Sequence, residues 1–387
     1  MMSGRLRVLI TNKSLVTWTG TEVYARDLAR KLQARGLCPV VYSQQWGKVA
    51  QELMASTIPV VRSLQQLGAP PDIIHGHHLH PTLCALTAFP GVPAIYFCHD
   101  WSAWHDAPLS HPRIGRYIAV DQTCRDRLIC TGSIPPNKVI HLPNWADLNR
   151  YRMRSSLPST PRRMLVFSSL YQRRRFRDPV QRACRAADVE LAQVGYANRR
   201  VLRAPEHELL RHDIVLAKGK SAMEAIASGA AVVLFGYNRI GPMVTSKNWE
   251  TLYDQNFGRR AIGQPLSVDS VLQAIRAYDP ADALEVARLF RQRCDIQPAV
   301  DRLIGIYGDV IDEFKRGSPC PQAEAAALTA YLERAEPMLD LGADRWLRKQ
   351  YTRQLWAWRP WRRKRPTGPP PCPDSADTAP TCSRRAA

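Results

Sequence analysis

The chain has 387 residues, of which 45% are hydrophobic and 23% are charged. These values are typical of globular proteins, and they exclude wholesale disorder, a collagen-like repeat and a multi-spanning membrane protein. Lys and Arg number 54 against 34 acidic residues, so the net charge is +20. A protein this basic is expected to bind acidic partners: nucleic acid, anionic lipid or phosphorylated small molecules.

The 10 cysteines are scattered and form no C-x-x-C pair, which favours buried free thiols in a reducing compartment over a disulfide framework. No apolar run approaches the roughly 18 residues that predict a membrane-spanning helix, and the first residues do not resemble a signal peptide. The sequence therefore predicts a cytosolic protein.

Strand and helix patterns alternate along the first half. The apolar run at 6–10 predicts a strand that is buried on both faces. A helical pattern follows and ends at Gly36, with Val23, Tyr24, Leu28 and Leu32 on one face. Further strands are predicted at 40–43, 71–75, 93–99 and 117–120. This alternation predicts a parallel sheet that is covered by helices on both sides.

The pattern restarts at 164 after a polar, Pro-bearing linker at 154–163. Strands are predicted at 164–169, 189–194, 213–216 and 230–235, and helices at 177–187, 206–211, 221–228, 268–278, 282–293 and 298–315. Residues 322–358 are predicted to be helical, and 360–387, with seven prolines, to be disordered. The predicted divisions are therefore a first domain 1–153, a second domain 164–316, a helical extension 317–359 and a tail 360–387.

Two doubly wound sheets are expected to face a cleft, and ligands bind beyond the carboxyl ends of parallel strands. The loop 11–26 follows the first strand, and its Gly20 would let the backbone approach a ligand closely. Thr19 and Glu22 fit a capping box, in which case Glu22 is only structural. Both interpretations stay open.

Histidines cluster after the third strand, at His75, His77, His78 and His80. No acidic or thiol ligand lies at a helpful spacing, so a metal site is not favoured. His99 and Asp100 follow the next strand. They are placed either for chemistry in the cleft or for anchoring the loop.

The segment 217–235 gives the strongest signal in the sequence. Two lysines, Lys218 and Lys220, precede a helix that we expect Ser221 to cap. Positive charge beside a helix N-terminus suits a diphosphate, and Glu224 in the first turn could accept hydrogen bonds from ribose hydroxyls. Alternatively, Glu224 only complements the helix dipole.

Residues 224–233 resemble the E-A-x-A-x-G-x-P/A-V-V motif in the second domain of retaining, GT-B-fold glycosyltransferases of family 4. Other segments resemble that family in the same order, and the resemblance covers roughly 5–315. They are TGTEVYARDLARKLQARG (19–36), PDIIHGHH (71–78), YIAV (117–120) and KVIHLPN (138–144).

Several positions depart from the family pattern. Leu216 stands where the family often has a glutamate that contacts the donor sugar. Thr19 and Trp145 replace glycines, and Asp121 replaces a serine. The family's Arg and Lys that bind the diphosphate have no clear match, although Arg173, Arg174 and Arg175 lie near their position.

The resemblance implies a GT-B enzyme that transfers a sugar from a UDP- or GDP-sugar donor to a glycan, lipid-linked or small-molecule acceptor. It implies retention of configuration and no metal or other cofactor. Lys218, the helix N-terminus at Ser221 and Ala222, and Arg173 would hold the diphosphate. Glu224 would hold the ribose, and His99 and Gly20 would face the donor sugar.

Three other functions stay open: a nucleotide-sugar epimerase, a nucleotide-sugar-binding homologue without turnover, and a nucleic-acid-binding protein. The last is the least expected. The segment 345–366 carries four tryptophans and nine basic residues, and Leu347, Tyr351, Leu355 and Trp358 in it lie at helical spacing. It could lie on an anionic membrane as an amphipathic helix, or pack back onto the first domain.

Overall fold

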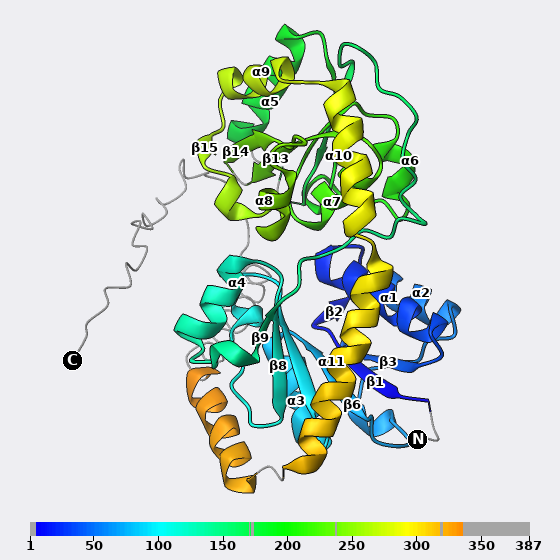
Figure 1. Cartoon of the computed structure of the whole chain (residues 1–387), viewed down its shortest axis with the longest axis vertical. Coiled ribbons are helices and arrows are strands. Elements are labelled where there is room, and N and C mark those ends of the chain that lie inside the picture. Colours follow the sequence, from blue (N-terminus) through cyan, green and yellow to red (C-terminus); the bar gives the residue numbers. More distant parts are fainter. Residues whose placement is uncertain (1–4, 170, 172–173, 237, 318–319, 336–387) are drawn as a thin grey trace, which may run out of the picture. The chain divides into compact units, whose positions relative to one another are not determined.

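The structure is a computed structural model, and it describes residues 5–169, 171, 174–236, 238–317 and 320–335. The elements discussed below belong to one unit that extends to Tyr331. They form two large sheets with flanking helices (Figure 1), which confirms the predicted α/β fold class. The basic segment 345–366 and the tail 360–387 lie outside the described residues.

The first sheet has seven parallel strands in the order β5-β3-β1-β6-β7-β8-β9. Their bounds are β1 Arg7–Thr11, β3 Cys38–Tyr42, β5 Val60–Val61, β6 Ile73–His77, β7 Ala94–Cys98, β8 Ile114–Ala119 and β9 Val139–His141. The central strands are buried on both faces, which is why they appear as continuous apolar runs. The five strands predicted for this half are confirmed, with ends that differ by a few residues.

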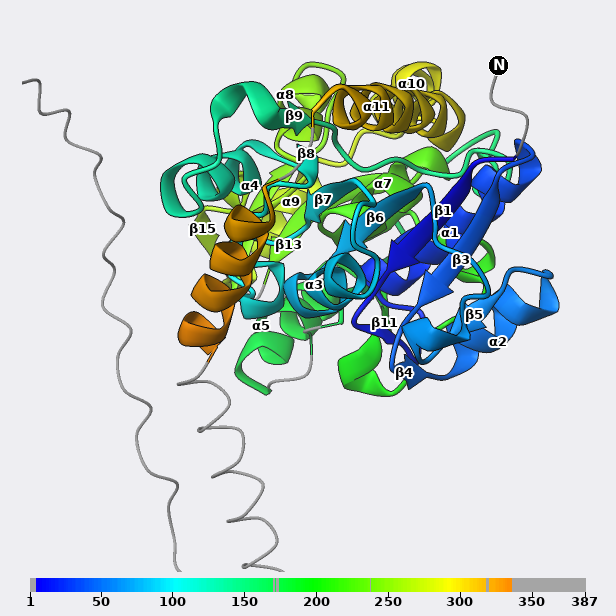
Figure 2. The ribbon, with the colours of Figure 1, turned by 90° about the horizontal axis from the view of Figure 1, so that it is seen from below.

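The helices of this half are α1 Gly20–Ala34, α2 Lys48–Ala55, α3 Leu79–Ala88 and α4 Gln122–Asp126. A late helix, α11 Ile296–Arg316, also packs on the first sheet, because Leu303, Tyr307 and Val310 belong to the first core. Figure 2 shows α11 and α3 on opposite sides of this sheet. The sequence groups α11 with the second half, since an apolar stripe shows that a helix buries one face but not which sheet it covers.

The second sheet has the order β11-β10-β12-β13-β14-β15. Its strands are β10 Arg163–Phe167, β11 Glu190–Val194, β12 Ile214–Ala217, β13 Ala231–Gly236, β14 Arg239–Met243 and β15 Gln264–Pro265. The first four are parallel and were predicted. The antiparallel edge strands β14 and β15 were not, because they are short, polar and interrupted by proline.

Six helices accompany the second sheet: α5 Arg174–Ala186, α6 Pro205–Leu209, α7 Lys220–Ala227, α8 Trp249–Asp254, α9 Val268–Arg276 and α10 Pro280–Arg293. The sheet has a separate apolar core on each face. Leu216 and Ala217 are neighbours on β12 and lie in different cores, as the alternation of a strand requires. The side chain at 216 is therefore enclosed by the fold.

Two further features bear on function. The short strands β2 Ser14–Leu15 and β4 Gln45–Trp46 pair beside the end of β1 and shape the loop before α1.

Among the described residues, no helix has the length and the apolar character needed to span a bilayer.

Candidate functional site

A cavity lies where α1 of the first half meets the carboxyl ends of β10 and β11 and the start of α7. Three of the predicted site residues, Gly20, Ser221 and Glu224, line it together. Four basic residues line it as well: Arg26, Arg150, Arg203 and Lys220. An excess of positive charge around one carboxylate suits an anionic ligand that also carries hydroxyl groups.

Lys220 connects the two sides of this cavity. Its Nζ lies 3.7 Å from Oε1 of Glu224 and 3.8 Å from Oδ2 of Asp27 on α1, and it donates a hydrogen bond of 3.3 Å to the Trp145 carbonyl. The side chain is only 10% exposed. Two nearby carboxylates stabilise its charge inside the protein, as the burial of an ammonium group requires.

Glu224 is 5% exposed and lies one turn after Lys220 on α7. Burial raises the pKa of Glu224, although Lys220 and Arg150 act in the opposite direction. A carboxylate in this position has hydrogen-bond acceptors that face a ligand space rather than bulk water. A carboxylate that only complements the helix dipole would not need to line a cavity, whereas Glu224 does line one.

The start of α7 differs in detail from the prediction. Gly219, at φ +56°, is the N-cap, so the predicted N-cap at Ser221 is wrong. The N–H of Ala222 donates to the Gly219 carbonyl at 3.0 Å and is not free for a ligand. The backbone N–H groups of Lys220 and Ser221 have no hydrogen-bond partner within the described part of the chain. Ser221 is thus the predicted residue that keeps a free donor at this cavity.

The start of α1 also differs in its hydrogen bonds from the pattern that the sequence suggests. Thr19 is the N-cap of α1, but its side chain accepts no backbone hydrogen bond, and its hydroxyl donates to the Glu22 carboxylate. The capping-box interpretation is therefore wrong, because no backbone N–H of the first turn donates to the Thr19 side chain. A Cβ built at Gly20 would meet no atom within 4 Å, so the backbone there faces open space.

His99, Asp100 and Lys218 do not line the cavity but gather beside it, after β7 and β12. The Asp100 carboxylate accepts backbone hydrogen bonds of 2.7 Å from Ser102 and Ala103. Burial alone raises the pKa of Asp100, but these bonds and the charge of Lys218 lower it overall. Lys218 itself is exposed. The predicted residues thus fall into two neighbouring groups. Arg173 lies outside the described residues.

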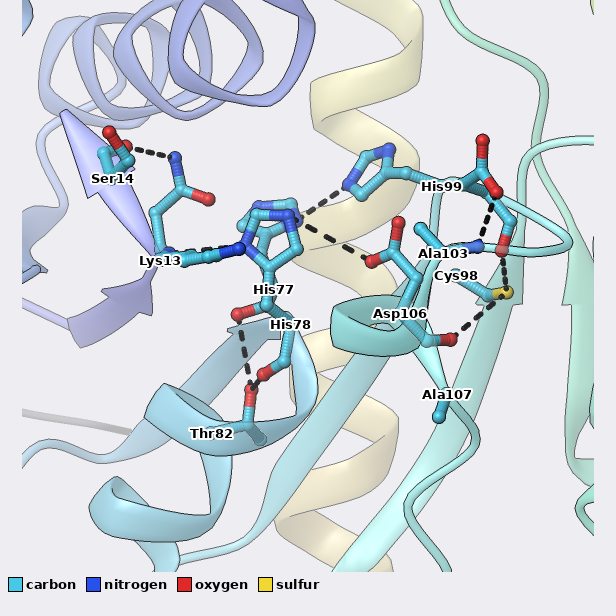
Figure 3. Close-up of polar contacts among 12 residues, drawn as sticks. Lys13, Ser14, His77, His78, Thr82, Cys98, His99, Ala103, Asp106 and Ala107 are labelled. Atoms are coloured by element: carbon cyan, nitrogen blue, oxygen red, sulfur yellow. Dashed lines mark hydrogen bonds and ion pairs between the residues drawn. The ribbon is translucent and has the colours of Figure 1, made fainter. Parts of the chain in front are cut away.

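The histidine-rich segment 75–80 covers the end of β6 and the start of α3, and His77 and His78 lie in separate environments (Figure 3). His78, His105 and Asp106 form the one group within the described ranges whose donor atoms, all within 4.8 Å of each other, could hold a metal ion. However, Nδ1 of His78 accepts a hydrogen bond of 3.1 Å from the Lys13 backbone N–H. In the neutral ring the proton is then on Nε2, which faces Asp106 and has no lone pair for a metal. This tautomer argues against metal binding by His78.

Sequence reasoning missed three cavity residues, Arg26, Arg150 and Arg203, and it named the charge of Lys220 without assigning that lysine to the site. One signal was available, because Lys220 and Glu224 have the i,i+4 spacing that brings side chains together on a helix. The three arginines belong to α1 and to two loops, and no local pattern brings them together. Only the folded chain places them around one cavity.

Comparisons with known proteins bear on the fold and on the first half of the chain. Residues 18–150 match the family model described as Glycosyltransferase Family 4. No curated protein sequence matches the chain significantly.

The fold is similar to that of a glycosyltransferase from Rickettsia africae ESF-5, with 12% identity, a TM-score of 0.57, and coverage of 79% of this chain and 99% of that one. It is also similar to Anabaena Alr3699/HepE in complex with UDP and glucose, with 16% identity, a TM-score of 0.59, and coverage of 79% and 100%. The same Anabaena protein in complex with UDP-glucose gives 16% identity and a TM-score of 0.54, again with 79% of this chain and 100% of that one covered.

Together these findings define the class of fold: two Rossmann-like sheets of the GT-B type, as found in glycosyltransferases. The match to the family model covers the first half, on the side of the cavity that carries Gly20 and Arg26.

Proposed function

We propose that this protein is a glycosyltransferase that moves a sugar from a nucleotide-sugar donor, UDP- or GDP-linked, to a glycan or lipid-linked acceptor. In keeping with the family 4 resemblance, the proposal includes retention of configuration and needs no metal. The observation that carries it is the cavity in which Glu224, the start of α7 and four basic side chains lie together. The Anabaena neighbour, solved with UDP-glucose, supports a donor of this class.

Each part of the donor has a proposed partner. The ribose hydroxyls donate to Glu224, and the diphosphate accepts from the N–H of Ser221 at the helix N-terminus, where the dipole favours negative charge. Lys218 and the basic side chains of the cavity neutralise the diphosphate as it leaves. Preorganised charge of this kind stabilises the transition state without reorganisation. His99 and Gly20 face the sugar.

One observation favours a second candidate, a homologue that binds nucleotide sugars without turnover. Leu216 replaces the glutamate that would contact the donor sugar, and it is fully buried in the core. The fold therefore supplies no carboxylate from this position. Donor binding without donor hydrolysis or transfer would favour this candidate.

The test is calorimetric titration with a panel of UDP- and GDP-sugars, followed by Glu224→Gln with the donor that binds. Hydrogen bonds to a charged acceptor contribute roughly 1.5–3 kcal/mol. We therefore expect Glu224→Gln to weaken donor binding by about tenfold or more.

Glu22→Gln is the matched control. Glu22 is also buried, and its pKa is also raised by burial, but it does not line the cavity. We expect it to leave the affinity for the donor unchanged. Equal donor affinity in wild type and in folded Glu224→Gln would refute the ribose assignment.

A further inference from the structure

Four aromatic rings, including that of His99, are in contact on one face of the first sheet. Side chains of a strand alternate between faces, so His75 and His77 share a face of β6, and Phe97 and His99 share a face at the end of β7. The register pairs His77 with Phe97, which brings these four rings together. The His77 and His99 centroids are 4.8 Å apart, and Phe97 stacks on His99 at 5.3 Å. The strand register therefore builds this group.

Within this group His77 and His99 are hydrogen bonded. Nδ1 of His77 lies 2.7 Å from Nε2 of His99 (Figure 3). Burial lowers the pKa of His77 well below its usual value, and burial lowers the pKa of His99 to about 3. Both rings are therefore neutral near pH 7, each ring carries one proton, and one of these protons lies in the shared hydrogen bond.

The surroundings of His77 indicate which ring donates. Its Nε2 is buried and has no hydrogen-bond partner among the described residues. If His99 donated, the proton of His77 would be on this Nε2 as a buried, unpaired N–H. Orphaned N–H donors are rarer in folded proteins than under-satisfied acceptors. A proton on Nδ1 of His77 is used in the bond and leaves only a lone pair unpaired.

The neighbouring His75 repeats this arrangement. Its Nδ1 lies 2.5 Å from the Tyr307 hydroxyl on α11, and its Nε2 is also buried without a partner in the described ranges. The same argument places its proton on Nδ1. His75 makes no hydrogen bond to His99, although its ring lies 4.6 Å from that of His77. It is therefore a close internal comparison for His77.

We propose that His77 is a positioning residue: by donating from Nδ1, it holds His99 as the Nδ1–H tautomer and so aims an uncharged N–H donor at the ligand. Nδ1 of His99 has no hydrogen-bond partner in the described part of the chain, and the residue is partly exposed. The identity of that ligand rests on the proposed function. In a nucleotide sugar, the acceptor of this hydrogen bond is a sugar hydroxyl or a phosphate oxygen.

A fixed tautomer matters because a neutral imidazole has one donor and one acceptor, and exchanging them reverses the hydrogen bond that a ligand meets. An orienting partner is a common way to select one tautomer. Without His77, His99 would be free to carry its proton on either nitrogen. The ligand would then meet a lone pair in part of the molecules.

The first test is spectroscopic and does not depend on activity. In protein with ¹⁵N-labelled histidine, the ring signals of His99 are assigned by their loss in His99→Gln, and they report which nitrogen is protonated. We expect Nδ1–H in wild type and in His75→Leu, and a mixture or Nε2–H in His77→Leu. Nε2–H in wild type, or an unchanged signal in His77→Leu, would overturn the proposal.

The second test is kinetic and compares two variants of His77 that each replace one of its two ring nitrogens. The amide nitrogen of Asn can take the place of Nδ1, whereas that of Gln takes the place of Nε2. We expect His77→Asn to keep most of the transfer rate and His77→Gln to lower kcat by about tenfold, the size of one hydrogen bond. This pair remains informative if His77→Leu does not fold.

His75→Asn serves as the control, because it alters an equally buried ring that is bonded to Tyr307 instead. We expect it to keep the wild-type kcat. Equal kcat in His77→Asn and His77→Gln contradicts the proposal. If no donor is turned over at all, the proposed function fails, and the spectroscopic test still decides the role of His77.

Discussion

At the scale of single residues, two lysines that are two positions apart have different surroundings. Lys220 is 10% exposed and lies between Glu224 and Asp27, whereas Lys218 is exposed and lies near Asp100. The turn at Gly219, with its positive φ, separates them. The sequence named both lysines for their charge and assigned the diphosphate to Lys218, while the cavity itself is lined by Lys220. Both belong to the proposed site.

Asp106 is a buried acidic residue in an unusual environment. It is 1% exposed, its Oδ1 has no hydrogen bond among the described residues, and Nε2 of His78 lies 3.9 Å from it. Burial, and then the charge of Asp100, raise the pKa of Asp106 to about 7, although Arg127 and Lys13 act against this. The folded protein therefore binds a proton here that the unfolded chain releases near pH 4.

This raised pKa predicts how stability depends on pH. A carboxyl group with a raised pKa contributes its full stability below the unfolded pKa, and this contribution is lost as the pH rises toward the folded pKa. We expect Asp106→Asn to gain stability relative to wild type as the pH rises from 4 to 8. The gain is up to about 4 kcal/mol, for roughly three pKa units at 1.36 kcal/mol each.

The measurement is denaturant unfolding of both proteins at several pH values. Asn also changes the local hydrogen bonding, but that effect is the same at every pH, so the slope of the difference is the diagnostic quantity. A difference that stays flat from pH 4 to 8 would show that Asp106 titrates normally in the folded state.

At the scale of elements, the loops that follow β10 and β11 form one wall of the cavity. Gly195 has φ +153°, and a Cβ there would lie 2.0 Å from the Ser168 carbonyl oxygen. Only glycine lets these two loops approach so closely. The shape of this wall therefore depends on one residue without a side chain.

We expect Gly195→Ala to lower the free energy of unfolding by about 1–3 kcal/mol, because the new methyl group overlaps backbone atoms that cannot move aside cheaply. It should also weaken donor binding by distorting the wall. The measurements are denaturant unfolding and calorimetric titration with the donor.

Gly20→Ala is the matched control, because its Cβ would meet open space. We expect it to leave stability within about 0.5 kcal/mol of wild type. It should weaken donor binding only if the donor approaches the backbone there, as we propose. Wild-type stability in Gly195→Ala would show that the two loops can separate without cost.

At the scale of the whole molecule, the net charge of +20 has more than one source. Part of it surrounds the cavity, where it fits a phosphorylated ligand. Another part belongs to the segment 345–366, which lies outside the described residues. Its attachment to an anionic membrane stays a prediction from the sequence.

Deleting residues 343–387 should weaken binding to vesicles that contain anionic lipid and change binding to neutral vesicles less. Each basic residue near an anionic surface contributes roughly 1 kcal/mol at best. Vesicle co-sedimentation measures the effect.

A shorter deletion, of residues 367–387, keeps the basic segment and is the control. It should bind anionic vesicles like the full chain. Equal binding by all three proteins would exclude a membrane role for 345–366, whereas loss of folded protein in the longer deletion would favour packing onto the first domain.

The sequence alone determined the α/β class and the positions of the central strands of both sheets. Continuous apolar runs mark strands that are buried on both faces, and periodic apolar residues mark the helices between them. It also singled out Gly20, Ser221 and Glu224, because ligands of parallel sheets bind after the strands. The inference of the fold class is confirmed, and the choice of site residues stays a prediction; both depend on residues that are close together in the chain.

Only the tertiary structure decided which sheet α11 covers, and that Arg26, Arg150 and Arg203 surround the same cavity as Glu224. It also decided that His77 bonds to His99, since this contact follows from the register of β6 on β7. Such contacts join residues that are distant in the chain, and their hydrogen bonds and charges depend on burial. Local patterns carry no information about either, which is why the sequence named Gly20, Ser221 and Glu224 but not the three arginines that line the same cavity.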